Sequence, residues 1–331
     1  MKGKLVYTGI RDAASQCEWA DRVPDHPGRY APEPGLRHAI SVALTLEKPL
    51  LVTGEPGTGK TQLAYHLAWA LGLDEPLKFE ATSGMEGKDL FYTYDALGRF
   101  HAAQDKDASS DALQFIAFQA LGRAIVRSVE TPSELPHGLR SAIADEPRAQ
   151  RSVVLIDEID KAPRDVPNDL LNQIEHMYFK LPECGGLEVR GNAERRPILL
   201  FTSNSERFLP DAFLRRCIFY DIPYPSESQL ETIIQRHLVL AEGRLPALVR
   251  DCVSLIDFLR SADAGLTRKP GPAELLDWLK VLVLQDNDLD EPLSAQEEIV
   301  VATACTLIKN RDDQVMIDEL IRQWRTSSAA C

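Results

Sequence analysis

The sequence predicts an α/β fold built on a mainly parallel sheet and followed by an all-helical region. Short apolar runs typical of buried strands alternate with segments of helical periodicity through the first two thirds of the chain. A glycine-rich loop directly follows the first apolar run, and a helical pattern follows the loop. After Pro225 the apolar spacing is helical to the end, so we predict a second, helical domain from that point.

Each expected element is placed by its apolar spacing and its flanking turn residues. Strands are expected at 49–53, 77–81, 153–157, 197–202 and 217–222, and helices at 34–46, 60–71, 110–128 and 166–179. The segment Cys184 to Asn192 contains glycines and suits a hairpin. The expected organisation is a polar leader at 1–32, an α/β core at 33–225 with an insert at about 84–104, a mobile proline-containing connection at 131–150, and a helical domain at 226–331.

Composition limits the function classes. The 37 basic and 50 acidic residues give a net charge of −13, which argues against broad, sequence-independent binding to nucleic acid. The six cysteines form no C-x-x-C pair and no zinc-like spacing with histidine. No signal peptide and no apolar run of about 20 residues is visible, so we expect a cytoplasmic protein without a membrane segment.

The segment Gly54-x-x-x-x-Gly59-Lys60-Thr61 matches the phosphate-loop pattern in full. Glycines let backbone N–H groups turn toward a phosphate, and the following helix adds partial positive charge at its start. Lys60 is expected to reach the β- and γ-phosphates, and the Thr61 hydroxyl to bind Mg²⁺. The residues expected to bind the nucleotide here are Gly54, Glu55, Pro56, Gly57, Thr58, Gly59, Lys60, Thr61 and Gln62.

A second acidic motif ends the most strand-like segment of the chain. Asp157 and Glu158 follow the apolar run that begins at Val153, about 100 residues after the glycine loop. Asp157 is expected at the carboxyl edge of the sheet, where it would bind Mg²⁺ through water. Glu158 is expected to orient and deprotonate the attacking water. Asp160 and Lys161 are assigned to the solvated start of the next helix.

These motifs together resemble the AAA+ ATPases. The glycine loop, the acidic strand end, a strand ending in Thr202-Ser203-Asn204, and Leu214-Arg215-Arg216-Cys217 occur in the order and spacing of that superfamily. Over about residues 33–285 the chain looks like the MoxR branch. That narrower resemblance rests on the insert after the second strand, on the segment Pro167 to Asn172, and on the helical C-terminal region.

The resemblance implies roles for residues outside the two phosphate motifs. Asn204 would be the first sensor, which helps to place the attacking water. Arg216, or alternatively Arg215, would be the arginine finger that enters the neighbouring subunit's site; local salt bridges to Asp211 or Asp221 are the other interpretation. Arg268 or Lys269 would be a second sensor that contacts the nucleotide; the sequence departs from the family's pattern here, and the alternative is that neither residue has this role.

The insert carries several aromatic side chains, which are Phe91, Tyr92, Tyr94 and Phe100. By resemblance they would project toward the centre of a ring and touch a client protein. The alternative is that they pack against the helix expected at 110–128, and for most of them we favour packing.

The resemblance implies an ATPase that uses ATP and Mg²⁺. It would work as a ring, expected to be a hexamer, that remodels, assembles or activates a partner protein. Two alternatives stay open. The first is an ATP-gated switch with little turnover, and the presence of Glu158 argues against it. The second is a nucleic-acid motor, and the net charge of −13 argues against it. The choice of ATP over GTP is also implied by the resemblance.

Overall fold

The computed structural model describes residues 26–104, 111–130, 139, 149–204, 208–238, 245–261, 263–284, 290–293 and 296–328. Most of the expected leader and most of the expected connection at 131–150 lie outside these residues. The chain forms two compact units. The first contains residues 32–54 and 60–222, and the second contains 29–31, 55–59 and 223–331. Glycine-loop residues 55–59 therefore belong to the second unit.

The centre of the first unit is a parallel sheet of five strands. Their order across the sheet is β2 (Leu77–Glu80), β5 (Val153–Asp157), β8 (Ile198–Thr202), β1 (Leu50–Gly54) and β9 (Ile218–Ile222). All paired neighbours run parallel. The predicted fold class is confirmed, and each of the five predicted strands is present.

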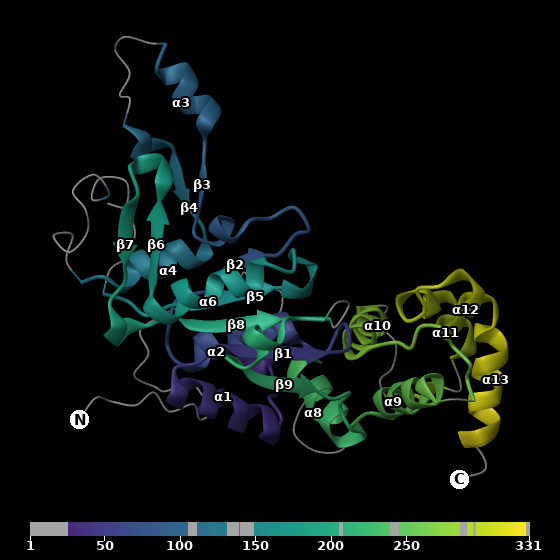
Figure 1. The fold of residues 1–331 in the computed structure, drawn as a ribbon. Helices are drawn as coiled ribbons and strands as arrows, with labels where there is room; N and C mark the ends of the chain where they lie inside the picture. Colours follow the sequence, from purple (N-terminus) through teal and green to yellow (C-terminus); the bar gives the residue numbers. More distant parts are fainter. Residues whose placement is uncertain are drawn as a thin grey trace. The chain divides into compact units, whose positions relative to one another are not determined.

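Helices cover both faces of this sheet. Helices α1 (Pro34–Leu46) and α2 (Lys60–Ala70) lie on one side, and α4 (Ala120–Ser128) and α6 (Val166–His176) lie on the other (Figure 1). Strand β5 is buried along its whole length, as its unbroken apolar sequence requires. The predictions of α1, α2 and α6 are confirmed, with α6 three residues shorter than expected.

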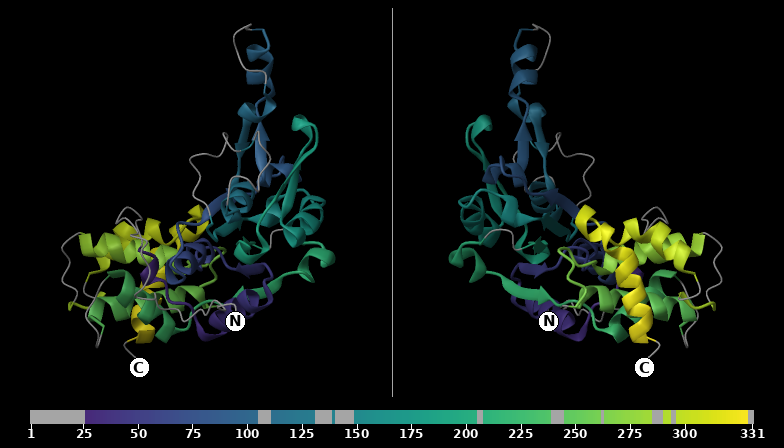
Figure 2. Two further views of the ribbon diagram at one scale, coloured as in Figure 1. Left: turned by 90° about the vertical axis from the view of Figure 1, so that its left-hand side faces the viewer. Right: turned by 90° about the vertical axis from the view of Figure 1, so that its right-hand side faces the viewer.

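The insert corrects one prediction. The helix expected at 110–128 begins only at Ala120, because β4 (Ile116–Phe118) pairs antiparallel with β3 (Tyr92–Tyr94) and the 3-10 helix Ala112–Phe115 precedes it. Helix α3 (Ala96–Ala102) follows β3. Figures 1 and 2 show this hairpin, with α3 at its far end, extending away from the sheet.

The aromatic side chains of the insert divide between core and surface. Phe91 and Tyr92 are buried and stack with Phe179 of β6 (Tyr178–Leu181). The backbone of Phe91 also lies so close to Gly122 of α4 that no side chain would fit there. These two rings are therefore packed in the core, but they stack on Phe179 of β6 and not on the helix expected at 110–128. Phe100 is 61% exposed.

The predicted hairpin near Cys184 is also present. Strand β6 pairs antiparallel with β7 (Leu187–Arg190), and a 3-10 turn at Pro182–Cys184 joins them. Gly185 and Gly186 take positive φ angles in this turn, a conformation that favours glycine.

The second unit is helical in its described residues, as predicted. Its helices are α8 (Glu227–Leu238), α9 (Ala247–Arg260), α10 (Pro272–Leu284), α11 (Glu297–Thr303), α12 (Arg311–Val315) and α13 (Ile317–Ser328). Trp278 is fully buried in its core, and its indole N–H donates to Thr303. None of the helices in the described parts of the chain is long and apolar enough to cross a membrane.

Candidate functional site

Because all five strands are parallel, the sheet brings their carboxyl ends to one edge. Val52 of β1 lies opposite Thr202 of β8, and Glu80 of β2 lies opposite Asp157 of β5. Strand β8 separates β5 from β1, so the end of β8 lies between the acidic motif and the start of the glycine loop. In open α/β sheets this carboxyl edge is where ligands usually bind.

Asp157 is the centre of a polar network at this edge. Its carboxylate accepts hydrogen bonds from the Thr61 hydroxyl at 3.1 Å and from the Thr202 hydroxyl at 2.5 Å. Lys78 of β2 forms an ion pair with it at 3.0 Å. Asp157 itself is buried, and a buried carboxylate requires such partners. The network holds the carboxylate and the Thr61 hydroxyl together.

Glu158 leaves the strand in a left-handed backbone conformation, with φ 55°. A residue with a Cβ adopts this conformation at a cost of about 1 kcal/mol. The Thr202 hydroxyl accepts from the Glu158 backbone N–H at 2.9 Å, which helps to hold the turn. The Glu158 carboxylate accepts from the Asn204 side-chain amide at 3.0 Å and from Lys161. The predicted base and the predicted first sensor are therefore in direct contact.

Lys60 begins helix α2 and is 8% exposed. Its ammonium group donates to the Gly54 carbonyl at 2.8 Å. Burial lowers the pKa of Lys60, and the nearby carboxylates of Asp157, Asp160 and Glu158 oppose that shift. A desolvated ammonium group interacts more strongly with an added anion than an exposed one does.

The glycine loop, residues 54–61, takes the conformation that its sequence predicts. Gly57 and Gly59 have φ angles of 82° and 85°. A Cβ at Gly59 would lie 2.9 Å from a Tyr30 ring carbon, and one at Gly57 would lie 3.2 Å from the Ala273 Cβ. Because both glycines have positive φ angles and close neighbours, larger residues would be strained at both positions.

The residues at this edge fit a magnesium–triphosphate ligand. Thr61 and Asp157 supply hard oxygen donors, and Mg²⁺ is usually bound by one or two protein ligands together with water and phosphate. Among the described residues no group of three or more His, Cys, Asp or Glu side chains forms a metal cage.

The two candidate finger arginines lie away from this network. Arg215 and Arg216 follow α7 (Asp211–Leu214), and both are exposed. Arg216 donates to the Ala212 carbonyl at 3.2 Å and lies 4.0 Å from a Glu175 carboxylate oxygen. In the described residues neither arginine pairs with Asp211 or Asp221. Their exposure leaves the predicted action on a neighbouring subunit open.

Arg268 and Lys269 precede α10 and are exposed. The backbone N–H of Arg268 donates to Asp313 at 3.2 Å. Within the described residues, neither side chain forms a hydrogen bond or ion pair with loop residues 55–59. A second-sensor role for either residue stays a prediction.

The bonds that three neighbours make to the acidic pair were not predicted from the sequence. Lys78 was not singled out, Thr202 was noted only as part of the strand end before Asn204, and Lys161, assigned to the solvated start of the next helix, pairs with Glu158. Asp160 was expected to be solvated and is instead 3% exposed, because the chain turns inward in the 3-10 helix Ile159–Lys161. The strand register, which puts Lys78 opposite Leu155, was the signal that a sequence reading lacked.

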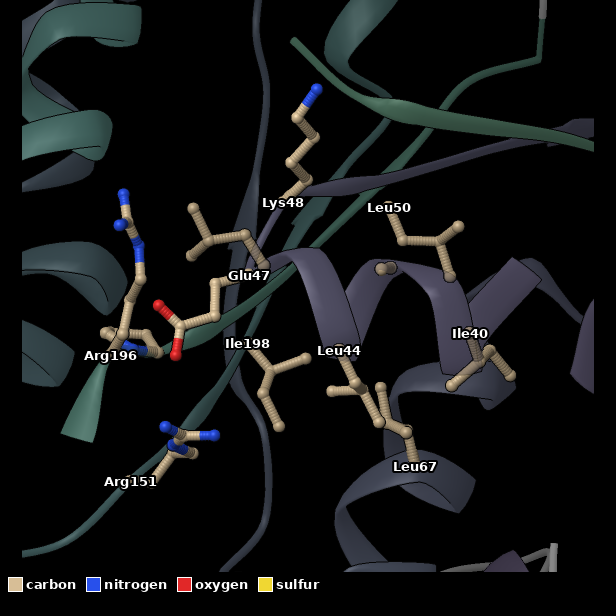
Figure 3. A pocket seen from close by; sticks show the side chains of 12 residues that line it. Ile40, Leu44, Glu47, Lys48, Leu50, Leu67, Arg151, Arg196 and Ile198 are labelled. Carbon is tan, nitrogen blue, oxygen red and sulfur yellow. The ribbon is translucent and has the colours of Figure 1, made fainter. Parts of the chain in front are cut away.

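A hollow lies at the opposite, amino edge of the same sheet (Figure 3). Its walls include Leu44 and Ile198, and its charged lining residues are Glu47, Lys48, Arg151 and Arg196. Leu50 and Ile198 are the first residues of their strands, so the hollow is separate from the network at the carboxyl edge.

The sheet, the glycine loop and the acidic strand end together define a P-loop nucleoside triphosphatase. More narrowly, residues 49–217 match the model of the AAA domain family (dynein-related subfamily), and the chain belongs to that family. An AAA domain implies nucleotide hydrolysis. A comparison with curated proteins gives no match.

A comparison with solved structures finds RuvB from Thermotoga maritima among the similar chains. A mutant of that protein shares 15% identity with a TM-score of 0.40, covering 84% of this chain and 79% of its own. The same organism's RuvB, described as a Holliday junction branch migration motor, gives 15% identity, a TM-score of 0.39, and coverage of 83% and 76%.

Proposed function

We propose that this protein is a MoxR-type AAA+ ATPase that hydrolyses MgATP and works as a ring on a partner protein. The observation that carries the proposal is the network in which Thr61 and Asp157 lie 3.1 Å apart and Glu158 contacts Asn204 at 3.0 Å. This arrangement supplies a cation site beside a base and a polar sensor, which are the parts that phosphoryl transfer requires.

Each residue has a defined task in this proposal. Bound MgATP supplies the reactive phosphoanhydride and the charge-neutralising cation. Lys60 and the loop N–H groups hold the phosphates, while Thr61 and Asp157 hold the cation, Asp157 through water. Glu158 leaves Lys161 and accepts the proton of the attacking water, which Asn204 orients. Arg216 or Arg215 stabilises the transferring phosphoryl group from a neighbouring subunit.

The partner-binding part of the proposal is supported by the insert. In helix α3, Leu97 is 72% exposed and Phe100 is 61% exposed. Leu97 and Phe100 are three residues apart and so share one face of the helix, and contiguous exposed apolar side chains mark protein contact sites. We assign this helix to contact with the partner protein.

Turnover and partner capture test the proposal with one variant. Glu158→Gln removes the base but keeps the shape of the side chain, so ATP hydrolysis should fall by about 100-fold or more while ATP binding is kept. The hydrolysis-deficient protein held in ATP should then sediment as a ring and retain its partner.

Two outcomes would contradict the proposal. Equal turnover in the wild type and in Glu158→Gln would remove Glu158 from the chemistry. Undiminished partner activation without hydrolysis would favour the ATP-gated switch. Partner capture should also weaken with Leu97→Ser and Phe100→Ser, and these two variants should keep basal ATP turnover.

A further inference from the structure

Within the second unit, Arg260 contacts the glycine loop through the side chain of Glu55. It is the last residue of α9, and its side chain is 12% exposed. One guanidinium nitrogen lies 2.8 Å from a Glu55 carboxylate oxygen, and the other donates to the Pro270 carbonyl at 2.8 Å. A single side chain therefore links the loop to the segment that precedes α10.

The orientation of the guanidinium group is fixed from a third side. Its central carbon lies 3.5 Å from the centre of the Tyr224 ring, within the range of a cation–π interaction. A planar guanidinium group can stack on a ring and donate in its own plane at the same time, whereas an ammonium group cannot. This geometry requires arginine rather than lysine.

The start of α10 meets the loop from the same unit. A Cβ at Gly271 would lie 2.9 Å from the Pro56 carbonyl oxygen, and a Cβ at Gly57 would lie 3.2 Å from the Ala273 Cβ. The Glu274 carboxylate accepts from the Gly271 N–H at 3.2 Å. Small residues thus allow close approach to residues 55–57, and the first turn of α10 itself carries no basic side chain.

The negative charge of Glu55 explains why an ion pair between Arg260 and the glycine loop matters for nucleotide binding. Glu55 is the only acidic residue in the loop Gly54-Glu-Pro-Gly-Thr-Gly-Lys-Thr61. An unneutralised carboxylate there would repel a triphosphate. Pairing with Arg260 neutralises that charge and fixes the direction of the side chain, although the half-exposed position of Glu55 moderates the energy involved.

We propose that Arg260 is the positioning residue of the glycine loop, which it prepares for triphosphate by neutralising Glu55 and fixing residues 55–57. The inference rests on the proposed ATPase function. It assigns to the end of α9 a task that neither Arg268 nor Lys269 performs in this structure.

A double-mutant cycle on the full-length protein tests it, with the dissociation constant of MgATP and the turnover number measured separately. Arg260→Ala should raise the dissociation constant about tenfold, because the Glu55 carboxylate then loses this cationic partner, and should lower turnover at saturation by less than about threefold. Glu55→Gln should tighten MgATP binding about two- to fivefold, because it removes a negative charge near the phosphates. In the Glu55→Gln background, Arg260→Ala should weaken binding by less than about twofold.

The controls separate positioning from a structural role. Arg250→Ala, at an exposed position of the same helix, should bind MgATP as the wild type does. Arg260→Lys keeps the positive charge but loses the planar fork, so it should weaken MgATP binding less than Arg260→Ala does, and it carries the comparison if the alanine variant does not fold. An equal loss of affinity from Arg260→Ala with and without Glu55, or no loss at all, overturns the inference. A wild type that neither binds nor hydrolyses MgATP overturns the proposed function instead.

Discussion

The two edges of the central sheet hold their charges in different ways. At the carboxyl edge, charged side chains bond to each other, as Lys78 does with Asp157 and Lys161 with Glu158. At the amino edge, two arginines beside Glu47 (Figure 3) bond to the backbone. Arg196 donates to the Ile174 and Glu175 carbonyls near the end of α6, and Arg151 donates to the Glu194 carbonyl.

This contrast suggests different roles for the two edges, with ligand binding at the carboxyl edge and stabilisation of the fold at the amino edge. A side-chain network can exchange one partner for a ligand atom, because each polar group in it can be satisfied in more than one way. An arginine that satisfies carbonyls at a helix end stabilises that end, and its loss is a matter of folding. We therefore expect substitutions at the carboxyl edge to change catalysis and those at the amino edge to change little beyond stability.

The largest effect is expected for Lys60→Ala. Lys60 is the buried cation of the glycine loop, so its loss should lower ATP turnover by about 1,000-fold and weaken MgATP binding at least about tenfold. The matched control is Lys48→Ala, an exposed lysine at the amino edge, which should keep wild-type turnover. Similar losses of ATP turnover in both variants would contradict the proposed difference between the two edges.

Thr202→Val should lower ATP turnover by less than Lys60→Ala does. The hydroxyl of Thr202 donates to Asp157 and accepts from the Glu158 N–H, and valine preserves its shape but not its bonds. Turnover should fall about tenfold, and the free energy of unfolding should fall by about 1–3 kcal/mol. Urea unfolding and steady-state kinetics give the two values. Unchanged kinetics would show that this hydroxyl does not support the site.

The thiol of Cys217, just before β9, gives a pH-dependent test at the amino edge. Burial raises its pKa to about 12, against a smaller opposing effect of Lys48. Between about pH 9 and 12 the unfolded chain loses this proton while the folded chain keeps it, so stability should fall as pH rises through that window. Cys217→Ala should lessen that fall in urea unfolding. An identical pH dependence in both proteins would contradict the assignment.

The smallest effect is expected for Arg151→Met. Burial lowers the pKa of Arg151, so its charge carries a desolvation cost, and the long apolar stem of methionine can occupy the same space. Turnover should stay within about twofold of the wild type, and unfolding free energy within about 1 kcal/mol. A large loss of turnover would place chemistry at the amino edge.

The same contrast explains what the sequence could predict. The glycine loop is contiguous, and the apolar run that ends at Asp157 is unbroken, so the main site residues and all five strands of the parallel sheet were predicted from local patterns. Lys78 and Thr202 reach Asp157 only through strand register, which depends on pairing between distant segments. Their part in the site could not be predicted from spacing.

The failed helix at 110–119 has a related cause. Ile116 to Phe118 is a short apolar run that suits a helix or a strand equally well by periodicity. Antiparallel pairing with Tyr92–Tyr94, more than 20 residues earlier, stabilises this segment as a strand. Local patterns were thus sufficient where a segment is long or carries a motif, and insufficient where a distant partner decides.

The most direct measurement is an experimental structure of the protein with a non-hydrolysable ATP analogue and Mg²⁺. We expect the terminal phosphates against Lys60 and the cation against Thr61, with Glu158 turned from Lys161 toward a water molecule. The account would be contradicted if the triphosphate were bound in the hollow between Leu44 and Ile198, or if the loop at residues 54–61 made no contact with the triphosphate.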